Sequence, residues 1–186
     1  MSKSYKVAIV VGSLRKESIN RKAAQELMRL APDNLSFDFV EIGDLPLYDE
    51  DVEAAGTPQS WTRFRDEISA ADAVLFVTPE YNRSVPGALK NAIDVGSRPY
   101  GQSAYSGKPA AVMSISPGGI GGFGANHHLR QSLVFLDMPV LQQPEAYVGG
   151  GFELFDDDGR LKSEGTEKFF KSFIDAFGDW IGRTAR

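Results

Sequence analysis

The chain contains no cysteine, and it has only two histidines among its 186 residues. Without thiols, the sequence excludes disulfide bonds, thiolate metal sites and cysteine nucleophiles. Any redox chemistry would therefore have to come from a bound cofactor.

Long apolar runs and an excess of positive charge are also missing. Residues 1–6 lead into an apolar stretch of strand length, too short for a transmembrane helix, and no small-residue cleavage site follows. A net charge of −5 argues against nucleic acid and anionic membranes as partners, because both require a basic surface. A length of 186 residues, with 42% hydrophobic and 24% charged residues, predicts a single globular domain over residues 1–186. The missing membrane run and cleavage site lead us to expect that it lies in the cytoplasm.

Strand and helix patterns alternate along the chain. Apolar runs predict strands at residues 7–11, 73–78 and 110–115, and weaker patterns predict strands at 36–42 and either around Val140 or at 146–148. Helical spacing predicts helices at residues 21–31, 61–71, 85–95, 125–136 and 166–183. Residues 43–60 are predicted to form a long loop, and 153–161 a hairpin or exposed turn. This alternation favours a parallel sheet with helices on both faces.

The first predicted strand ends at Gly12 and is followed by polar side chains. Ser13, Arg15, Ser18 and Asn20 lie where a helix would begin. Unpaired backbone N–H groups and the helix dipole favour an anion at such a position, and a guanidinium adds a charge-assisted contact. The loop therefore suits a terminal phosphate. The alternative is an N-cap serine, a solvated arginine and an ordinary first-turn asparagine, and the spacing alone does not decide between them.

Loops after the third and fourth predicted strands belong to the same expected site. In doubly wound sheets, ligands bind outside the carboxyl ends of the strands, where the strand order reverses. After the third strand, Tyr81 could lie against a flat ring, and backbone N–H groups around Asn82 could bond its polar edge. The alternative is a simple turn followed by a capped helix.

Three other patterns suggest sites that we reject. Residues 119–124 fit G-x-G-x-x-G, but they do not follow the first strand, and Asp137 lies too close to serve as the acidic partner. We expect these glycines to let the backbone pass close to a planar ring, or to provide positive φ angles. His127 and His128 point in different directions on a helix, so we expect no metal. Residues 156–159 lack the later glutamate of a calcium loop.

Two longer motifs resemble one family, the bacterial NAD(P)H-dependent FMN reductases, and within it the soluble quinone and chromate reductases. One motif is Gly12-Ser13-Leu14-Arg15 with Ser18 and Asn20. The other is Thr78-Pro79-Glu80-Tyr81-Asn82 with Ser84, Pro86-Gly87, Leu89-Lys90 and Asn91-Ala92-Ile93-Asp94. The resemblance continues through Gly121-Gly122, His128-Leu129-Arg130-Gln131 and Leu133-Val134-Phe135-Leu136, and so covers nearly the whole chain.

The resemblance implies a flavodoxin-like fold with strand order 2-1-3-4-5 and tightly bound FMN. It places the FMN phosphate at Ser13, Arg15, Ser18 and Asn20. It places the isoalloxazine ring at Pro79, Glu80, Tyr81 and Asn82, and the pyrimidine edge or ribityl chain at Ser116, Pro117, Gly118 and Gly119. No side chain is expected to be catalytic and no metal is expected, because the flavin N5 would carry the hydride.

The resemblance also implies NADH or NADPH as electron donor and quinones as acceptors, with chromate, azo compounds or free flavin as further acceptors. It implies a homodimer or homotetramer, with contacts expected through the helices at 85–95 and 125–136. Gly124 lies at a position where relatives can carry an arginine, and this difference bears on the expected contacts between subunits. The rival interpretations are a flavodoxin-type electron carrier and a nucleotide-binding regulator without turnover.

Overall fold

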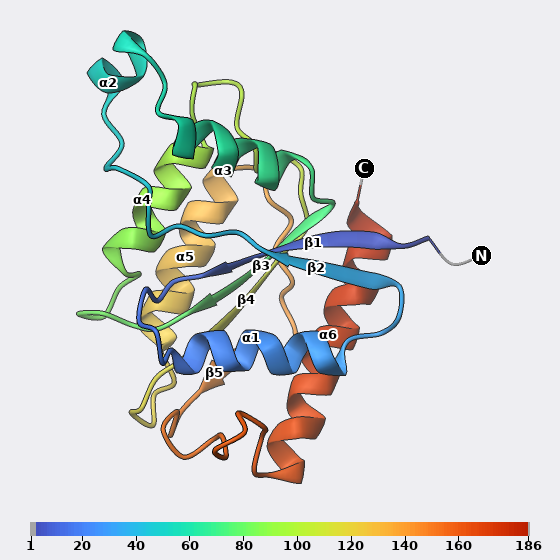
Figure 1. Ribbon diagram of the computed structural model, residues 1–186. Coiled ribbons are helices and arrows are strands. Elements are labelled where there is room, and N and C mark those ends of the chain that lie inside the picture. Colours follow the sequence, from blue (N-terminus) through green and yellow to red (C-terminus); the bar gives the residue numbers. More distant parts are fainter. Residues whose placement is uncertain (1–2, 186) are drawn as a thin grey trace.

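The computed structural model describes residues 3–185, which form a five-stranded parallel sheet in the order β2-β1-β3-β4-β5 (Figure 1). The strands are β1 (Tyr5–Val11), β2 (Leu35–Phe39), β3 (Ala73–Thr78), β4 (Ala110–Ile115) and β5 (Ala146–Val148). The helices are α1 (Ile19–Leu30), α2 (Glu50–Ala55), α3 (Gln59–Ser69), α4 (Gly87–Gly96), α5 (Phe123–Phe135) and α6 (Glu164–Thr184). The predicted flavodoxin-like strand order is confirmed.

Helices cover both faces of the sheet, as predicted. α1 and α6 pack over one face, whereas α3, α4 and α5 pack over the other (Figure 1). β1 serves both cores because neighbouring side chains of a strand point to opposite faces: Val7 and Ile9 join the α1–α6 core, and Ala8 and Val10 join the other. Every residue of the central strands β3 and β4 is buried, which explains their uninterrupted apolar sequences.

The prediction of a continuous loop over residues 43–60 is wrong. This segment contains α2 and the start of α3. Asp49 caps α2 by accepting a hydrogen bond from the Asp51 N–H at 2.9 Å, and acidic residues in the first turn suit the positive end of the helix dipole. No residue of α2 is buried, so the sequence carries no apolar periodicity that could have revealed the helix.

Other boundaries differ by a few residues. β2 ends at Phe39 rather than at residue 42, and the following Val40 and Ile42 turn into the core under α3. The fifth strand is at 146–148, while Val140 forms only an isolated bridge with Ala110. The predicted turn at 153–161 is closed by an antiparallel bridge between Phe155 and Leu161.

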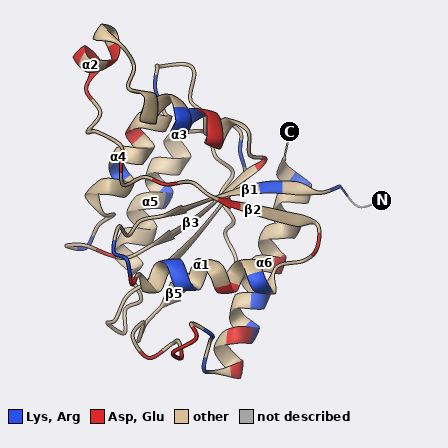
Figure 2. Ribbon diagram, in the orientation of Figure 1, with Lys and Arg blue, Asp and Glu red and all other residues tan. Residues whose placement is uncertain are grey.

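Charges of both signs lie along α6, whereas α2 carries acidic residues only (Figure 2). Within residues 3–185, no helix combines the length and apolar character needed to cross a membrane.

Candidate functional site

Three loops at the carboxyl edge of the sheet surround one cavity of about 150 Å³. They follow β1, β3 and β4 and lie at the left of Figure 1. The cavity is lined by Ser13, Arg15, Ser18, Ile19, Asn20, Pro79, Glu80, Tyr81, Ile115, Ser116, Pro117 and Phe152. All of the predicted site residues except Asn82, Gly118 and Gly119 thus line a single space, although they come from three distant parts of the sequence.

The loop after β1 leads directly into α1, and Ser18 caps that helix. The Ser18 hydroxyl oxygen accepts a hydrogen bond from the Arg21 N–H at 3.3 Å, so the N-cap interpretation is correct for this residue. A hydroxyl that accepts in this way still has its own hydrogen to donate, so capping leaves Ser18 able to bind an anion as well. The first turn of α1 contains no acidic residue to compete with such an anion.

Two side chains of this loop have polar groups without protein partners. Asn20 is only 1% exposed, and its Oδ1 atom has no hydrogen-bond partner. A half turn of the amide exchanges its oxygen and nitrogen, so the side chain can offer a donor instead. The Arg15 guanidinium forms no ion pair with any residue that the structure describes. A buried amide and a free guanidinium beside a helix N-terminus fit the phosphate of FMN.

The loop after β3 is a tight two-residue hairpin. The N–H groups of Tyr81 and Ser84 each donate to the carbonyl oxygen of the other at 3.0 Å. Between them, Asn82 and Arg83 have positive φ angles of 52° and 62°, as in a type I′ turn. This strained backbone leaves Tyr81 beside the cavity, whereas Asn82 lies at the tip of the turn and outside the cavity lining.

The carboxylate of Glu80 contacts α5. Its Oε2 atom accepts a hydrogen bond from the Ala125 N–H at 3.0 Å, and its Oε1 atom lies 3.2 Å from Arg83 Nη1. Glu80 was predicted to line the flavin ring, and it does border the cavity. Both carboxylate oxygens are nevertheless engaged with protein groups.

The loop after β4 is packed tightly against the segment that follows β5. Ser116 donates its N–H to Val148 O at 3.1 Å and accepts at its carbonyl from the Gly151 N–H at 3.0 Å. Gly118 and Gly119 lie outside the cavity lining, against Gly149, where an added Cβ would stand 3.0 Å from the Gly118 oxygen. The two segments therefore form one wall of the site.

Phe152 belongs to this wall and was not predicted. Its side chain is 62% exposed and lines the cavity. The segment beyond it is tied to α1 through the buried carboxylate of Glu26, which binds Arg160 Nη1 at 2.9 Å and the Leu161 N–H at 3.2 Å. The sequence does contain a pattern that could have indicated this wall: three glycines followed by a phenylalanine at residues 149–152.

The glycine-rich run at 119–124 supplies positive φ angles, which was one of the two expectations. Gly121 and Gly122 have φ angles of 66° and 77°, and a Cβ on Gly121 would lie 2.5 Å from the Tyr147 carbonyl carbon. Positive φ and close approach to a neighbouring backbone both require glycine here.

The adjacent histidines contact different partners. His127 Nε2 lies 2.9 Å from the Tyr147 hydroxyl, and His128 Nδ1 lies 2.9 Å from Ser84 Oγ. Burial, together with the Glu145 carboxylate, raises the pKa of Tyr147 to about 12, so this phenol stays protonated at neutral pH. No cluster of three potential metal ligands occurs in the described part of the chain.

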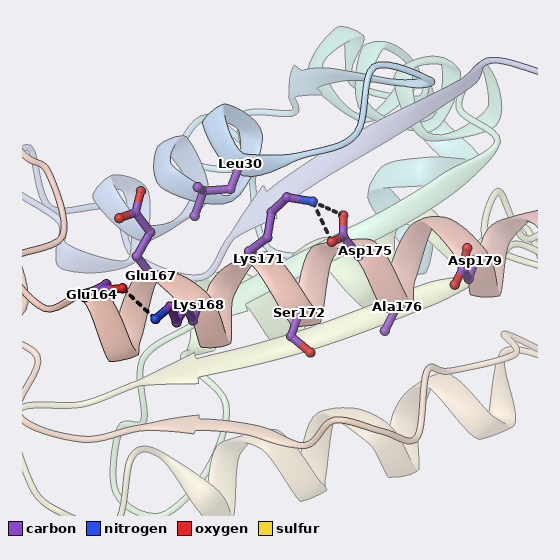
Figure 3. A pocket seen from close by; sticks show the side chains of 9 residues that line it. All are labelled: Leu30, Glu164, Glu167, Lys168, Lys171, Ser172, Asp175, Ala176 and Asp179. Carbon is purple, nitrogen blue, oxygen red and sulfur yellow. Dashed lines mark hydrogen bonds and ion pairs between the residues drawn. The ribbon is translucent and has the colours of Figure 1, made fainter.

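Larger hollows also occur. One of about 370 Å³ shares Ser13 and Arg15 with the cavity, and the others lie elsewhere. A groove of about 780 Å³ between α1 and α6 is lined mostly by charged side chains, and Figure 3 shows Lys168 and Lys171 paired with Glu164 and Asp175 on α6. These i,i+4 pairs are typical of a solvated helix surface. A second hollow, of about 700 Å³, lies between α4 and α5. The cavity at the sheet edge is smaller, but it unites the motif residues.

Comparisons with known proteins point to one family. The sequence profile described as NADPH-dependent FMN reductase matches residues 5–153, which include every predicted site residue. A quinone reductase of Pseudomonas putida is 67% identical over 181 residues, covering 97% of each chain. A 2-hydroxy-1,4-benzoquinone reductase of Burkholderia sp. is 46% identical over 178 residues, covering 96% of this chain and 97% of the relative.

A solved structure extends this similarity to three dimensions. The flavoenzyme NAD(P)H:(acceptor) oxidoreductase FerB from Paracoccus denitrificans superposes with a TM-score of 0.92 at 46% sequence identity. The match covers 98% of this chain and 100% of FerB, so the loops around the cavity fall within it.

Proposed function

Because the chain belongs to the NADPH-dependent FMN reductase family, we propose that it is an FMN-dependent oxidoreductase that carries a hydride from NADH or NADPH to a quinone. The observation that carries the proposal is the convergence of the β1 and β3 loops on one cavity, with the unpartnered Asn20 amide at its phosphate end. The reductase names of full-length relatives support turnover over the alternative of a flavodoxin-type carrier.

We assign the phosphate group of FMN to the start of α1. Arg15 supplies a positive charge, Ser13 and Ser18 supply hydroxyl donors, and Asn20 supplies its amide. The α1 N-terminus adds its dipole. These groups would hold FMN by its charged end, independently of the ring.

We assign the isoalloxazine ring to Pro79, Glu80, Tyr81 and Asn82, and its pyrimidine edge or the ribityl chain to Ser116, Pro117, Gly118 and Gly119. When bound, FMN would supply the redox chemistry, which is hydride transfer from a nicotinamide and reduction of the acceptor. The protein supplies orientation, and backbone N–H groups near Asn82 and residues 118–119 would stabilise negative charge on the ring. No side chain needs to act as a general acid or base.

Quinones are the proposed acceptors, because relatives of 67% and 46% identity are named as quinone and benzoquinone reductases. Chromate, azo compounds and free flavin are further acceptors under this proposal. Initial rates of NADPH consumption, measured with each compound separately at the same concentration, would rank them.

The test is direct. Purified protein reconstituted with FMN should bind one equivalent, show a flavin absorption spectrum, and oxidise NADH or NADPH when benzoquinone is added. Reduction of bound FMN by NAD(P)H without any partner protein separates a reductase from an electron carrier. A colourless protein after reconstitution would refute the proposal, as would a flavoprotein that NAD(P)H does not reduce.

We further propose that the chain forms a homodimer or homotetramer through the face formed by α4 and α5. Val134 and Phe135 on α5 are 73% and 76% exposed, and Phe135 borders the hollow between the two helices. Large exposed apolar side chains beside a hollow are typical of a protein interface. Light scattering should show at least twice the monomer mass, and Phe135→Asp should reduce it to the monomer mass.

The proposed reductase is a single domain spanning residues 1–186 and acts in the cytoplasm, because its reaction needs a continuous supply of NADH or NADPH. Cell fractionation with an activity assay would test the location.

A further inference from the structure

The helix α5 begins without a cap of its own. Its N-cap residue, Gly122, has a left-handed backbone and no side chain, so it offers no oxygen to the free N–H groups of the first turn. Glu80, 45 residues earlier in the chain, fills this role, because its Oε2 atom accepts the Ala125 N–H at 3.0 Å. The cap of α5 is therefore delivered by the turn beside the cavity.

The surroundings of Glu80 suit an acidic side chain in this position. The side chain is only 10% exposed, and the first turn of α5 contains no acidic residue. A negative charge at the N-terminus of a helix is stabilised by the helix dipole and by the unpaired N–H groups. Arg83 occupies the other carboxylate oxygen from within the same turn.

Two further features fit the turn to α5. A Cβ on Gly124 would lie 2.9 Å from Glu80 Oε2 and 2.7 Å from the Arg83 carbonyl oxygen, so the absence of a side chain there leaves room for the turn. Ser84, at the end of the turn, makes a second contact with α5 through His128 at 2.9 Å.

The turn requires such support because of its backbone. Asn82 and Arg83 both have positive φ angles, a conformation that costs a non-glycine residue free energy. It persists only when the surrounding structure holds it. Two backbone hydrogen bonds between Tyr81 and Ser84 close the turn, and the contacts from Glu80 and Ser84 fasten it to α5.

We propose that Glu80 is a positioning residue whose carboxylate fastens the 81–84 turn to α5, and thereby holds Tyr81 and the Asn82 backbone in place for the flavin ring. The inference rests on the proposed function. It assigns Glu80 to the protein scaffold rather than to direct contact between its carboxylate and the flavin.

The length and the charge of the side chain at position 80 distinguish a scaffold role from direct contact with the flavin. Glu80→Gln keeps the length of the side chain and an oxygen that accepts the Ala125 N–H, but removes the charge. Glu80→Asp keeps the charge but is one methylene too short to make the same contact. If Glu80 positions the turn, Glu80→Gln should bind FMN within about threefold of the wild type, while Glu80→Asp and Glu80→Ala should bind about tenfold more weakly.

The measurement is a fluorescence titration with both FMN and riboflavin, supported by the visible circular dichroism of the saturated proteins. Riboflavin lacks the phosphate, so a displaced ring turn should weaken both ligands by the same factor and alter the dichroism. Glu164→Ala, which removes an exposed carboxylate from α6, serves as the charge control. Unchanged affinity in Glu80→Ala would overturn the inference. So would wild-type binding by Glu80→Asp together with weak binding by Glu80→Gln.

The same titrations distinguish an error in the proposed function from an error in the role of Glu80. A wild-type protein that binds neither FMN nor riboflavin refutes the function itself, whereas normal wild-type binding with an insensitive Glu80 refutes only the positioning role. If Glu80→Ala does not fold, the Gln and Asp variants decide the matter.

Discussion

The loops after β1 and β3 border the same cavity, but different contacts hold them in place. In the first loop, Ser13 and Ser18 hydrogen-bond to backbone groups two and three residues further along the chain. In the second, Glu80 and Ser84 contact α5 across 45 and 44 residues. The phosphate end of the site is thus built from local interactions, and the ring end depends on the folding of α5.

This difference separates the effects expected from mutations. Substitutions in the first loop should weaken binding of the phosphate alone and leave the rest of the site intact. Changes in the second loop should affect helix packing and flavin binding together, because the same contacts serve both.

The largest expected effect comes from Arg15→Ala. We expect the affinity for FMN to fall about 100-fold, because a charge-assisted contact with the phosphate is lost, while riboflavin binding changes by less than about threefold. Parallel fluorescence titrations measure both values. An equal loss for riboflavin would show that the two ends of the site are not independent.

The next effect comes from Gly124→Ala. Its methyl group would press on the Arg83 carbonyl oxygen and on Glu80, so we expect a loss of about 2 kcal/mol in the free energy of unfolding. Gly87→Ala is the matched control, because Gly87 also lies in the first turn of a helix but has no atom within 4 Å of an added Cβ. Urea unfolding of both variants provides the comparison, and equal stability would contradict the tight fit of the turn against α5.

A third effect concerns Glu26, which ties α1 to the wall that carries Phe152. Burial raises the pKa of Glu26, but hydrogen bonds from Arg29, Arg160 and the Leu161 N–H outweigh this and hold it below its ordinary value of 4.5. A pKa lower in the folded than in the unfolded chain adds stability above pH 4.5, and this stability is lost as the pH falls through the folded-state value.

Glu26→Gln should therefore be less stable than the wild type at neutral pH, by roughly 1 kcal/mol, and the difference should shrink as the pH falls below the ordinary carboxyl value of 4.5. Urea unfolding across this range tests the sign. A difference that grows with acidity would contradict the lowered pKa.

The smallest effect is expected from Arg83→Gly, and it has the opposite sign. Glycine adopts positive φ without strain and is preferred at the second central position of a type I′ turn. We expect a gain of about 0.5 kcal/mol, since the Arg83 side chain is 72% exposed and its ion pair with Glu80 therefore contributes little. Thermal unfolding measures the change, with Arg83→Ala as a control that keeps the strain. A loss in both variants would assign a larger role to the ion pair.

The features that followed from the sequence are those with local causes. The buried runs of β1, β3 and β4 identify the central strands, and the polar residues that follow them identify the loops at one sheet edge. Ser18 illustrates the limit, because its position beside a helix start suits both a cap and a phosphate contact. The structure confirms the cap, and the phosphate contact stays a prediction.

The features that could not be predicted from the sequence depend on distant contacts or lack apolar periodicity. The partner of the Glu80 carboxylate lies on α5, and no spacing within residues 79–87 indicates it. Phe152 borders the cavity only because its segment packs against Ser116 through backbone hydrogen bonds. The helix α2 buries no residue, so no apolar pattern marks it.

The makeup of the cavity wall has a chemical consequence. Quinones are electrophiles that form covalent adducts with thiolates and amines, and an enzyme that reduces them is exposed to alkylation by its own substrate. The residues lining this cavity include no cysteine, lysine or histidine, and their only positive side chain is the guanidinium of Arg15. A reductase built this way should lose little activity to alkylation at this cavity, because the cavity lining offers a quinone neither a thiol nor an amine.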